Sequence, residues 1–308
     1  MATLRDIRTR IASVKNTQQV TRAMKMVAAA KLRRAQENIF RTRPYAFKIG
    51  EIVDHLKHQG AVDAHPLLQA HEEVESVLVI VITGDRGLAG AFNSNVIKTA
   101  EALIAGKYAA FQATERVRVV GVGRKGFEYF NKRGYKMAAD YSGVFRDLTF
   151  DTAQSLGELA TMGYMNRSWD EVKLVYNEFR NTISQNRIVE PLLPVPPEQF
   201  RTPVMQLEDV SAPQFSAQYT AHYIFEPDPQ QILNELVPRF VNFQIWRALL
   251  ESSAAEQGAR MVAMDNATSN ANELLRSLRL QYNRARQSAI TTEILEIIAG
   301  ANALEEAA

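Results

Sequence analysis

Hydrophobic and small residues recur in steps of three and four along the C-terminal part of this 308-residue chain. Residues 239–299 include no proline and a single glycine, Gly258. The repeating positions are Ala267, Ala271, Leu274, Leu278, Tyr282, Ala285 and Ala289. Such spacing is typical of a coiled-coil seam, and one continuous helix of this length would extend roughly 90 Å. The pattern predicts a long C-terminal helix that packs against a second helix.

The N-terminal 43 residues contain neither glycine nor proline and carry a second apolar stripe. Its positions are Leu4, Ile7, Ile11 and Val14, followed less regularly by Val20, Met24, Val27, Ala35 and Ile39. Helical periodicity resumes after Pro44 and ends before Gly60. We expect helices over 1–58 and 215–304 to pack as one antiparallel coiled coil, because both have seams. The C-terminal helix is the longer one, so its tip should project beyond the first helix.

The middle of the chain has a different period. Residues 77–83 form an almost continuous apolar run, as in a strand buried on both faces, and 117–121 and 172–179 predict two more strands. Helical patterns lie between and beside them, near 95–111, up to 133, and over 150–166. Strands alternating with helices predict a mostly parallel sheet covered by helices. We therefore expect an α/β fold in which a Rossmann-like domain, residues 74–200, is inserted between the two long helices.

Basic residues are concentrated on the N-terminal helix. Eleven Lys and Arg lie within the first 43 residues against only Asp6 and Glu37, a local balance of +9, while the whole chain carries +2. This bias predicts an acidic partner surface, nucleic acid or lipid. An arginine-rich start is also typical of transit peptides. The segment continues without a break into further helical pattern, which favours a basic helix of the mature protein.

Composition excludes several classes of chemistry. The chain contains no cysteine, so it has no disulfides, thiolate zinc sites or cysteine nucleophiles. It lacks a run of about 18 apolar residues, so we expect no transmembrane segment. Four of its five histidines, His55, His58, His65 and His71, lie close together, but no HExxH pattern or convergent carboxylate accompanies them. We expect no metal site, no cofactor and no catalytic residue.

Two glycine-rich turns follow the predicted strands. GVGRKG at 121–126 fits the G-x-G-x-x-G pattern of dinucleotide-binding folds, but it follows the second strand, and the acidic residue expected about 20 positions later is not cleanly placed. TGDRGLAG at 83–90 lacks the ending of a P-loop. We interpret both as tight strand-to-helix turns, with Asp85, Arg86 and Gly87 in a structural role.

Two other functions remain open on these grounds. The central domain could bind NAD or another nucleotide, with the coiled coil as an interaction arm. The basic helix could instead bind nucleic acid, although its cations lack interleaved aromatic residues and no docking motif is present.

Three separated blocks resemble the gamma subunit of F-type ATP synthases. They are IRTRIASVKNTQQVTRAMKMVAAAKLRRAQ near the N-terminus, TGDRGLAG with GVGRKG in the middle, and SSAAEQGARMVAMDNATSNANELLRSLRLQYNRARQSAITTEILEIIAGANAL near the C-terminus. The resemblance covers essentially the whole chain. It implies a non-catalytic rotor shaft that couples ion flow through the membrane sector to ATP synthesis or hydrolysis at the beta subunits.

The same resemblance implies partners and a location. The two terminal helices would form the shaft inside a ring of three alpha and three beta subunits, with one copy of this chain. The α/β domain would form a foot joined to the epsilon subunit and the c-ring, with delta, a and b subunits in the same complex. The match begins within a few residues of Met1. We therefore expect a peripheral protein at the cytoplasmic face of a bacterial inner membrane.

Site residues follow from the matching motifs. The resemblance implies beta-subunit contacts at Met24 and Lys25, opposite an acidic lever, and at Gln257 and Arg260 on the second helix. It implies an apolar bearing at the C-terminal tip, whose residues are Ile294, Ile297, Ile298 and Leu304. The chain departs from many family members at Ala89, where they carry cysteine, and it lacks the cysteine pair of the redox-regulated chloroplast form.

Overall fold

The computed structural model describes residues 3–58, 65–196, 202–204 and 228–306. The chain divides into two compact units. The helical unit consists of Met1–Val27 with Ala263–Ala308, and the sheet unit is Ala28–Val262. The boundary cuts both long helices, because the inner part of each one packs within the sheet unit.

Two long helices, α1 (Leu4–His58) and α7 (Pro229–Glu306), supply most of the helical structure. Helix α7 begins with a cap: the Asp228 carboxylate accepts from the backbone N–H of Gln230 at 3.1 Å. Pro229 follows at the first helical position, where its missing N–H costs nothing. We expected this helix from residue 215, but 215–227 lie outside the described residues.

In the helical unit α1 and α7 run antiparallel, joined by a ladder of polar contacts. The pairs, in order along α1, are Arg8 with Tyr282 (2.7 Å), Gln18 with Asn272 (2.5 Å), Thr21 with Thr268 (2.8 Å) and Lys25 with Asp265 (2.6 Å). Each step forward on α1 corresponds to a step back on α7 that is equal to within one residue. The expected antiparallel coiled coil is confirmed, with polar layers inside its seam.

The seam positions differ in part from those expected. Leu275 is buried and Leu274 is exposed, so the sequence assigned the wrong leucine. On α1, Val20 and Val27 are exposed, while Thr21 and Ala28 are buried in their place. The Thr21 hydroxyl pairs with Thr268 across the seam, so threonine suits this interface as well as an apolar side chain does. A search for apolar positions does not detect such a residue.

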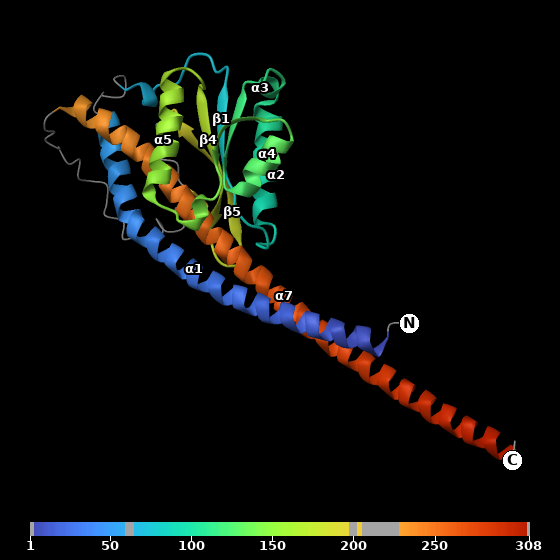
Figure 1. The fold of residues 1–308 in the computed structure, drawn as a ribbon. Helices are drawn as coiled ribbons and strands as arrows, with labels where there is room; N and C mark the ends of the chain where they lie inside the picture. The colour runs from blue at the N-terminus through green and yellow to red at the C-terminus, as the bar shows by residue number, and fades with distance from the viewer. Residues whose placement is uncertain (1–2, 59–64, 197–201, 205–227, 307–308) are drawn as a thin grey trace. The chain divides into compact units, whose positions relative to one another are not determined.

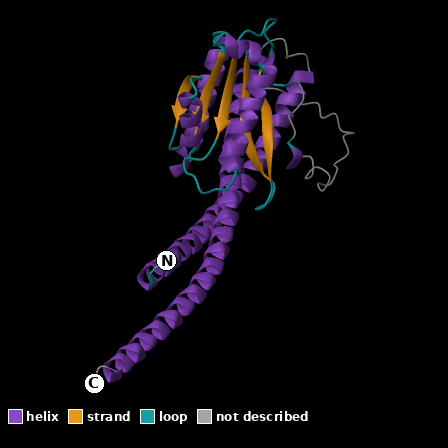
Figure 2. Ribbon diagram, turned by 90° about the vertical axis from the view of Figure 1, so that its right-hand side faces the viewer, coloured by secondary structure: helices purple, strands orange, loops and turns teal. Residues whose placement is uncertain are grey.

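The sheet unit is built on a five-stranded sheet in the order β3-β2-β1-β4-β5. Figure 1 labels β1, β4 and β5, and Figure 2 draws the strands in orange. Its strands are β1 (Val77–Ile82), β2 (Val117–Val122), β3 (Lys136–Tyr141), β4 (Glu171–Phe179) and β5 (Gln185–Leu193). β1 pairs in parallel with β2 and β4, β2 pairs in parallel with β3, and β5 pairs antiparallel with β4. The inserted Rossmann-like α/β domain is therefore confirmed.

Two strands, β3 and β5, were not expected from the sequence. Both lie at sheet edges and lack the continuous apolar run that revealed β1. β5 contains Pro191, which had been read as part of the exit from the domain. Proline is tolerated there because an edge strand has one side without a ladder partner.

Helices cover both faces of the sheet (Figure 1). They are α2 (Phe92–Lys107), α3 (Ala109–Ala113), α4 (Arg124–Lys132) and α5 (Phe150–Met165). The core on one face joins Leu78, Ile80 and Ile82 to α5 and to the first part of α7. On the other face, alternate β1 residues pack on α2 and α4. Every β1 side chain is fully buried, and each contributes about 1.5–3 kcal/mol of stabilisation.

Candidate functional site

The G-x-G-x-x-G turn between β2 and α4 is closed by the protein itself. At a helix N-terminus of this type, the first backbone N–H groups are the donors that bind a phosphate. Here they are already engaged by Asp85 Oδ1 for Arg124 (3.0 Å), the Gly84 carbonyl for Lys125 (3.2 Å) and Thr83 Oγ1 for Gly126 (2.8 Å). The turn therefore holds α4 against the end of β1, as expected of a structural turn.

Packing explains why glycines occupy this motif. Gly123 has φ +88°, and a Cβ atom there would lie 2.0 Å from the Thr83 carbonyl oxygen. A Cβ atom on Gly126 would lie 2.8 Å from Thr83 Oγ1. Side chains at these positions would collide with Thr83, the residue directly after β1, so the motif needs glycine for close approach of two chain segments.

Asp85 links three parts of the sheet unit. In addition to Arg124 N, its carboxylate accepts from the backbone N–H groups of Gly143 at 2.7 Å and Phe145 at 3.2 Å. Hydrogen bonds to an ionised acceptor are about twice as strong as neutral ones. Asp85 thus fixes the 83–90 loop, the start of α4 and the turn after β3 relative to one another, while Arg86 and Gly87 are exposed.

Arg260 lies against the same loop. Its Nη2 donates to Glu256 Oε1 at 2.5 Å and to the Gly87 carbonyl at 3.4 Å. The Glu256 side chain is 5% exposed and Arg260 is 12% exposed. Burial raises the pKa of Glu256, and the Arg260 guanidinium opposes that rise. Gln257 is also buried. The structure thus brings Arg260 to the 83–90 loop, a contact that the sequence did not indicate.

Met24 and Lys25 lie in the helical unit and are both half-buried. Lys25 Nζ is 2.6 Å from Asp265 Oδ1 on α7, and the two side chains are 41% and 55% exposed. An ion pair this open to water is worth about 0–1 kcal/mol. Lys25 can therefore exchange Asp265 for another carboxylate at little cost.

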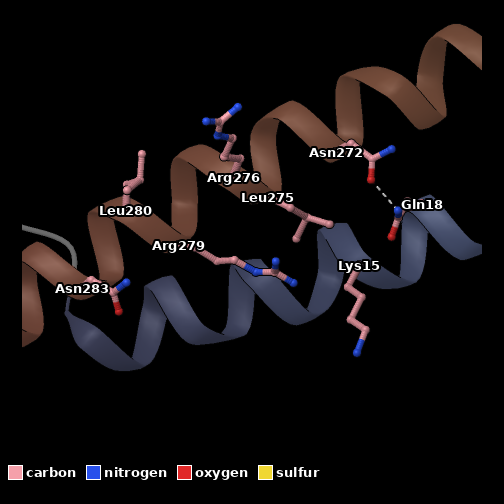
Figure 3. Close-up of a pocket in the computed structure, with 8 residues that line it drawn as sticks. All are labelled: Lys15, Gln18, Asn272, Leu275, Arg276, Arg279, Leu280 and Asn283. Carbon is pink, nitrogen blue, oxygen red and sulfur yellow. Dashed lines mark hydrogen bonds between the residues drawn. The ribbon is translucent and has the colours of Figure 1, made fainter.

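A basic hollow of about 510 Å³ lies between α1 and α7 in the helical unit (Figure 3). It is lined by Lys15, Gln18, Asn272, Leu275, Arg276, Arg279, Leu280 and Asn283. Figure 3 shows the Arg279 side chain extending from α7 toward α1, near Lys15. The cations of α7 thus add to the +9 of the N-terminal segment, which the sequence analysis had considered alone. The signal was present as two arginines three residues apart, on one face of the predicted helix.

The C-terminal tip of α7 exposes a row of large apolar side chains. They are Ile290, Ile294, Leu295, Ile297 and Ile298. Leu304 lies in the same helix, but its side chain is outside the described residues. Since the last ladder contact of α1 is Arg8 with Tyr282, this tip extends past the partner helix. An apolar surface of this kind is typical of a site that binds another protein.

The histidines that the structure describes have local structural roles. His65 Nδ1 accepts from the Leu67 N–H at 3.2 Å, and burial lowers the pKa of His65. His71 Nδ1 pairs with Asp170 at 2.7 Å and stacks on Tyr164. The side chains of His55 and His58 lie outside the described residues. No cluster of three metal-ligating side chains occurs among the residues described.

Among the helices in the described part of the chain, none is both long and apolar enough to cross a membrane.

Known proteins with similar sequences resolve the alternatives. A family model described as ATP synthase matches residues 3–304. The ATP synthase gamma chain of Salinibacter ruber is 61% identical over 306 residues, which cover 99% of each chain. The ATP synthase gamma chain of Chloroherpeton thalassium is 52% identical over 308 residues, the full length of both. The chain belongs to the ATP synthase gamma chain family.

Solved structures agree with membership of the gamma chain family. A chain from the Tetrahymena thermophila mitochondrial ATP synthase central stalk and c-ring is 27% identical, with a TM-score of 0.57 over 80% of this chain and 99% of that one. A chain from the Euglena gracilis mitochondrial ATP synthase has a TM-score of 0.64 over 98% and 94% of the two chains, and at 22% identity it shows the fold alone. The resemblance of the three sequence blocks is thus confirmed, and the nucleotide-binding alternative is not supported.

Within this chain, the structure groups the predicted residues into three places. Met24 and Lys25 are in the helical unit, Arg260 is beside Asp85 in the sheet unit, and the isoleucines are at the tip of α7. Sequence reasoning missed Glu256, which no motif singled out, and the two α7 arginines of the basic hollow, Arg276 and Arg279. It also missed a buried ion pair between Arg247 and Glu190, since pairing of residues 57 positions apart leaves no local pattern.

Proposed function

We propose that the chain is the central rotor shaft of an F-type ATP synthase, turning inside a ring of three alpha and three beta subunits. The observation that carries the proposal is 61% identity to an ATP synthase gamma chain along 99% of both sequences. The antiparallel helices, the basic surface and the apolar tip are the parts such a shaft requires. The α/β domain is the foot, joined to the epsilon subunit and the c-ring.

The shaft acts without catalysing any bond change. A partner shifts an equilibrium between conformations only through its different affinities for them. The faces of the helical unit differ chemically, since the basic hollow lies on only part of its surface. As the shaft turns, each beta subunit meets a different face in sequence. Rotation of the shaft is thereby converted into ordered changes in the nucleotide affinity of the beta subunits.

Met24 and Lys25 are the proposed contact with an acidic lever of the beta subunit. Two features support this assignment: Lys25 is 41% exposed, and its ion pair with Asp265 is worth little. Charge attraction at partly exposed sites falls as salt rises. Because an attraction at such an exposed site is weak, the contact with the beta subunit should form while the shaft is at rest and break readily as it turns.

Gln257 and Arg260 are the proposed contact of the second helix with a beta loop. Arg260 keeps some exposure and already holds the 83–90 loop through Gly87. A beta loop would therefore meet a guanidinium whose position is fixed from behind by Glu256. Such preorganisation lowers the entropic cost of forming a contact.

The tip isoleucines, with Leu304, are the proposed bearing. Dispersion contacts have little angular preference, so an apolar sleeve around this tip would not favour one rotational position. Burial of the tip in the assembly also removes an apolar surface that is exposed on the isolated chain.

The assembly would include delta, a and b subunits and would be driven by a flow of protons or sodium ions. This chain would be peripheral, at the cytoplasmic face of a bacterial inner membrane. The similar gamma chains of Salinibacter ruber and Chloroherpeton thalassium come from bacteria, which supports that location.

The experiment that tests the proposal is ATP hydrolysis by matching alpha and beta subunits, assembled with and without this chain. We expect sustained turnover and a stable complex, with one copy of the chain for three beta subunits, only when it is added. A matched control is the same chain with Ala271→Pro, which interrupts the helical unit. If the chain neither joins the ring of alpha and beta subunits nor changes its ATP turnover, the proposed shaft function is refuted.

A further inference from the structure

Helix α7 is fixed in the sheet unit by polar side chains on two sides, in addition to its apolar contacts. These side chains are Arg247, Glu251, Glu256 and Arg260, which we call the polar clamp. At about 100° per residue, Glu251 lies near the same side of the helix as Arg247, whereas Glu256 and Arg260 lie on roughly the opposite side. All four residues belong to the sheet unit.

Arg247 makes the most buried of these attachments. Its Nη2 lies 2.6 Å from both carboxylate oxygens of Glu190 on β5, and its Nη1 donates to Tyr176 Oη on β4 at 3.0 Å. Tyr176 Oη in turn donates to Glu190 Oε2 at 2.8 Å. The Arg247 and Glu190 side chains are only 7% and 3% exposed. A single guanidinium thus ties α7 to two adjacent strands.

The other attachments involve different parts of the sheet unit. Glu251 Oε2 accepts from the Phe179 N–H at 3.1 Å, at the last residue of β4. On the opposite side, Arg260 donates to Glu256 and to the Gly87 carbonyl. The helix is therefore bonded to β4, to β5 and to the 83–90 loop, which meet it from different directions.

We propose that the polar clamp is the torque-bearing joint between the α/β domain and the shaft. The proposal rests on the proposed function and adds a role to Arg247, Glu251 and Glu256, to which that function assigns no contact with another subunit. Arg247 is a positioning residue in this scheme, since it fixes the angle of α7 relative to the sheet.

A comparison of the two kinds of contact supports this role. The apolar core under α7 resists separation, but dispersion contacts have little directional preference, so side chains can slide past one another. Hydrogen bonds weaken steeply when their angle falls, so a guanidinium bonded to Glu190 through Nη2 and to Tyr176 through Nη1 resists both twist and shift. A buried ion pair is also weak evidence for stability, because desolvation offsets its attraction. Its contribution here is geometric: it specifies one angle of the helix.

The test is a stall measurement on the assembled complex. A magnetic bead is attached to the sheet unit, and the opposing torque at which ATP-driven rotation slips is recorded. The variant replaces the buried network by apolar residues, Arg247→Met with Glu190→Leu and Tyr176→Phe. The control replaces an exposed ion pair on the same helix, Arg239→Met with Glu235→Leu, whose side chains are 61% and 75% exposed.

We expect the buried variant to assemble and to hydrolyse ATP without load like wild type, yet to slip earlier. If the three attachments share the load equally, losing one lowers the slipping torque by about a third. The control should match wild type. A second variant, Arg247→Lys, keeps the charge but lacks the two separate nitrogens that reach Glu190 and Tyr176, so it should give an intermediate torque. It also provides the test if the apolar variant does not fold.

The outcomes separate the two proposals. If wild-type chain fails to assemble or to rotate, the proposed function is wrong. If wild type rotates and both buried variants slip at the wild-type torque, the clamp is not the torque-bearing joint. A lower unloaded turnover in the buried variants, with unchanged slipping torque, would likewise overturn it.

Discussion

The buried pair between Arg247 and Glu190 makes a strong prediction about stability. The Glu190 side chain is 3% exposed, and Arg247→Met removes the donor that contacts both of its carboxylate oxygens. Removing one partner of a buried pair costs about 3–5 kcal/mol, because the remaining charge is left without compensation. For a unit of this size, about 2–4 °C per kcal/mol applies, so the melting temperature should fall by roughly 6–20 °C.

Replacing the whole network should be much less damaging. With Glu190→Leu and Tyr176→Phe added to Arg247→Met, no charge or hydroxyl of the network stays buried without a partner. Apolar replacement of a buried pair is often neutral or stabilising. We therefore expect this triple variant to melt within a few degrees of wild type, and above the single variant.

The assay is thermal unfolding of the full chain, followed by near-ultraviolet circular dichroism, with Arg239→Met as the exposed control. The control should lose at most about 1 kcal/mol, since surface pairs contribute little. The reasoning is refuted if Arg247→Met melts like the control. It is also refuted if the triple variant is as unstable as the single one, because the loss would then come from packing and not from the uncompensated charge.

Three further predictions concern other parts of the chain. Asp85→Ala should lower the unfolding free energy by about 2–4 kcal/mol, because three backbone donors lose a charged acceptor. Urea unfolding measures this loss, and a urea midpoint equal to that of Arg86→Ala would contradict the prediction. Ala271→Pro should cost about 3 kcal/mol or more in the buried seam, visible as lost far-ultraviolet helix signal; unchanged signal and melting would contradict it. Burial raises the pKa of Asp170, but hydrogen bonds from His71 and neighbouring backbone groups hold that pKa below its usual value. This carboxylate therefore adds stability above about pH 4 that is lost as pH falls through its folded pKa, and Asp170→Asn should flatten the acid limb of the stability curve; parallel curves for the two proteins would count against it.

The sequence predicted the long helices and the central parallel strands because their signals are local. β1 is a run of buried aliphatic residues, and the seam near Leu278 repeats every three or four positions. β3 and β5 gave no such signal, because an edge strand is buried on less of its surface and is defined by pairing with a distant neighbour.

The candidate site divides in the same way. The motifs led to Met24, Lys25 and Arg260, but the partners of these side chains could not be read from the sequence. Glu256 lies beside Gly84, and Glu190 beside Arg247, only because the chain folds back over the sheet. Choosing Leu274 over Leu275 for the seam was an error of one position, since both fit an apolar repeat, and the polar layers at Thr21 and Gln18 decide the register.

The antiparallel ladder of the helical unit has a consequence for how such chains change in length during evolution. Gln18 must meet Asn272 and Thr21 must meet Thr268, although no loop within this unit joins the two helices. A residue inserted in one helix would move every later polar layer out of register with its partner. Insertions and deletions should therefore be accepted only as whole heptads, added or removed at matching positions on both helices. We therefore expect the α1 segment from Arg8 to Lys25 and the α7 segment that it pairs with to keep matching lengths during evolution.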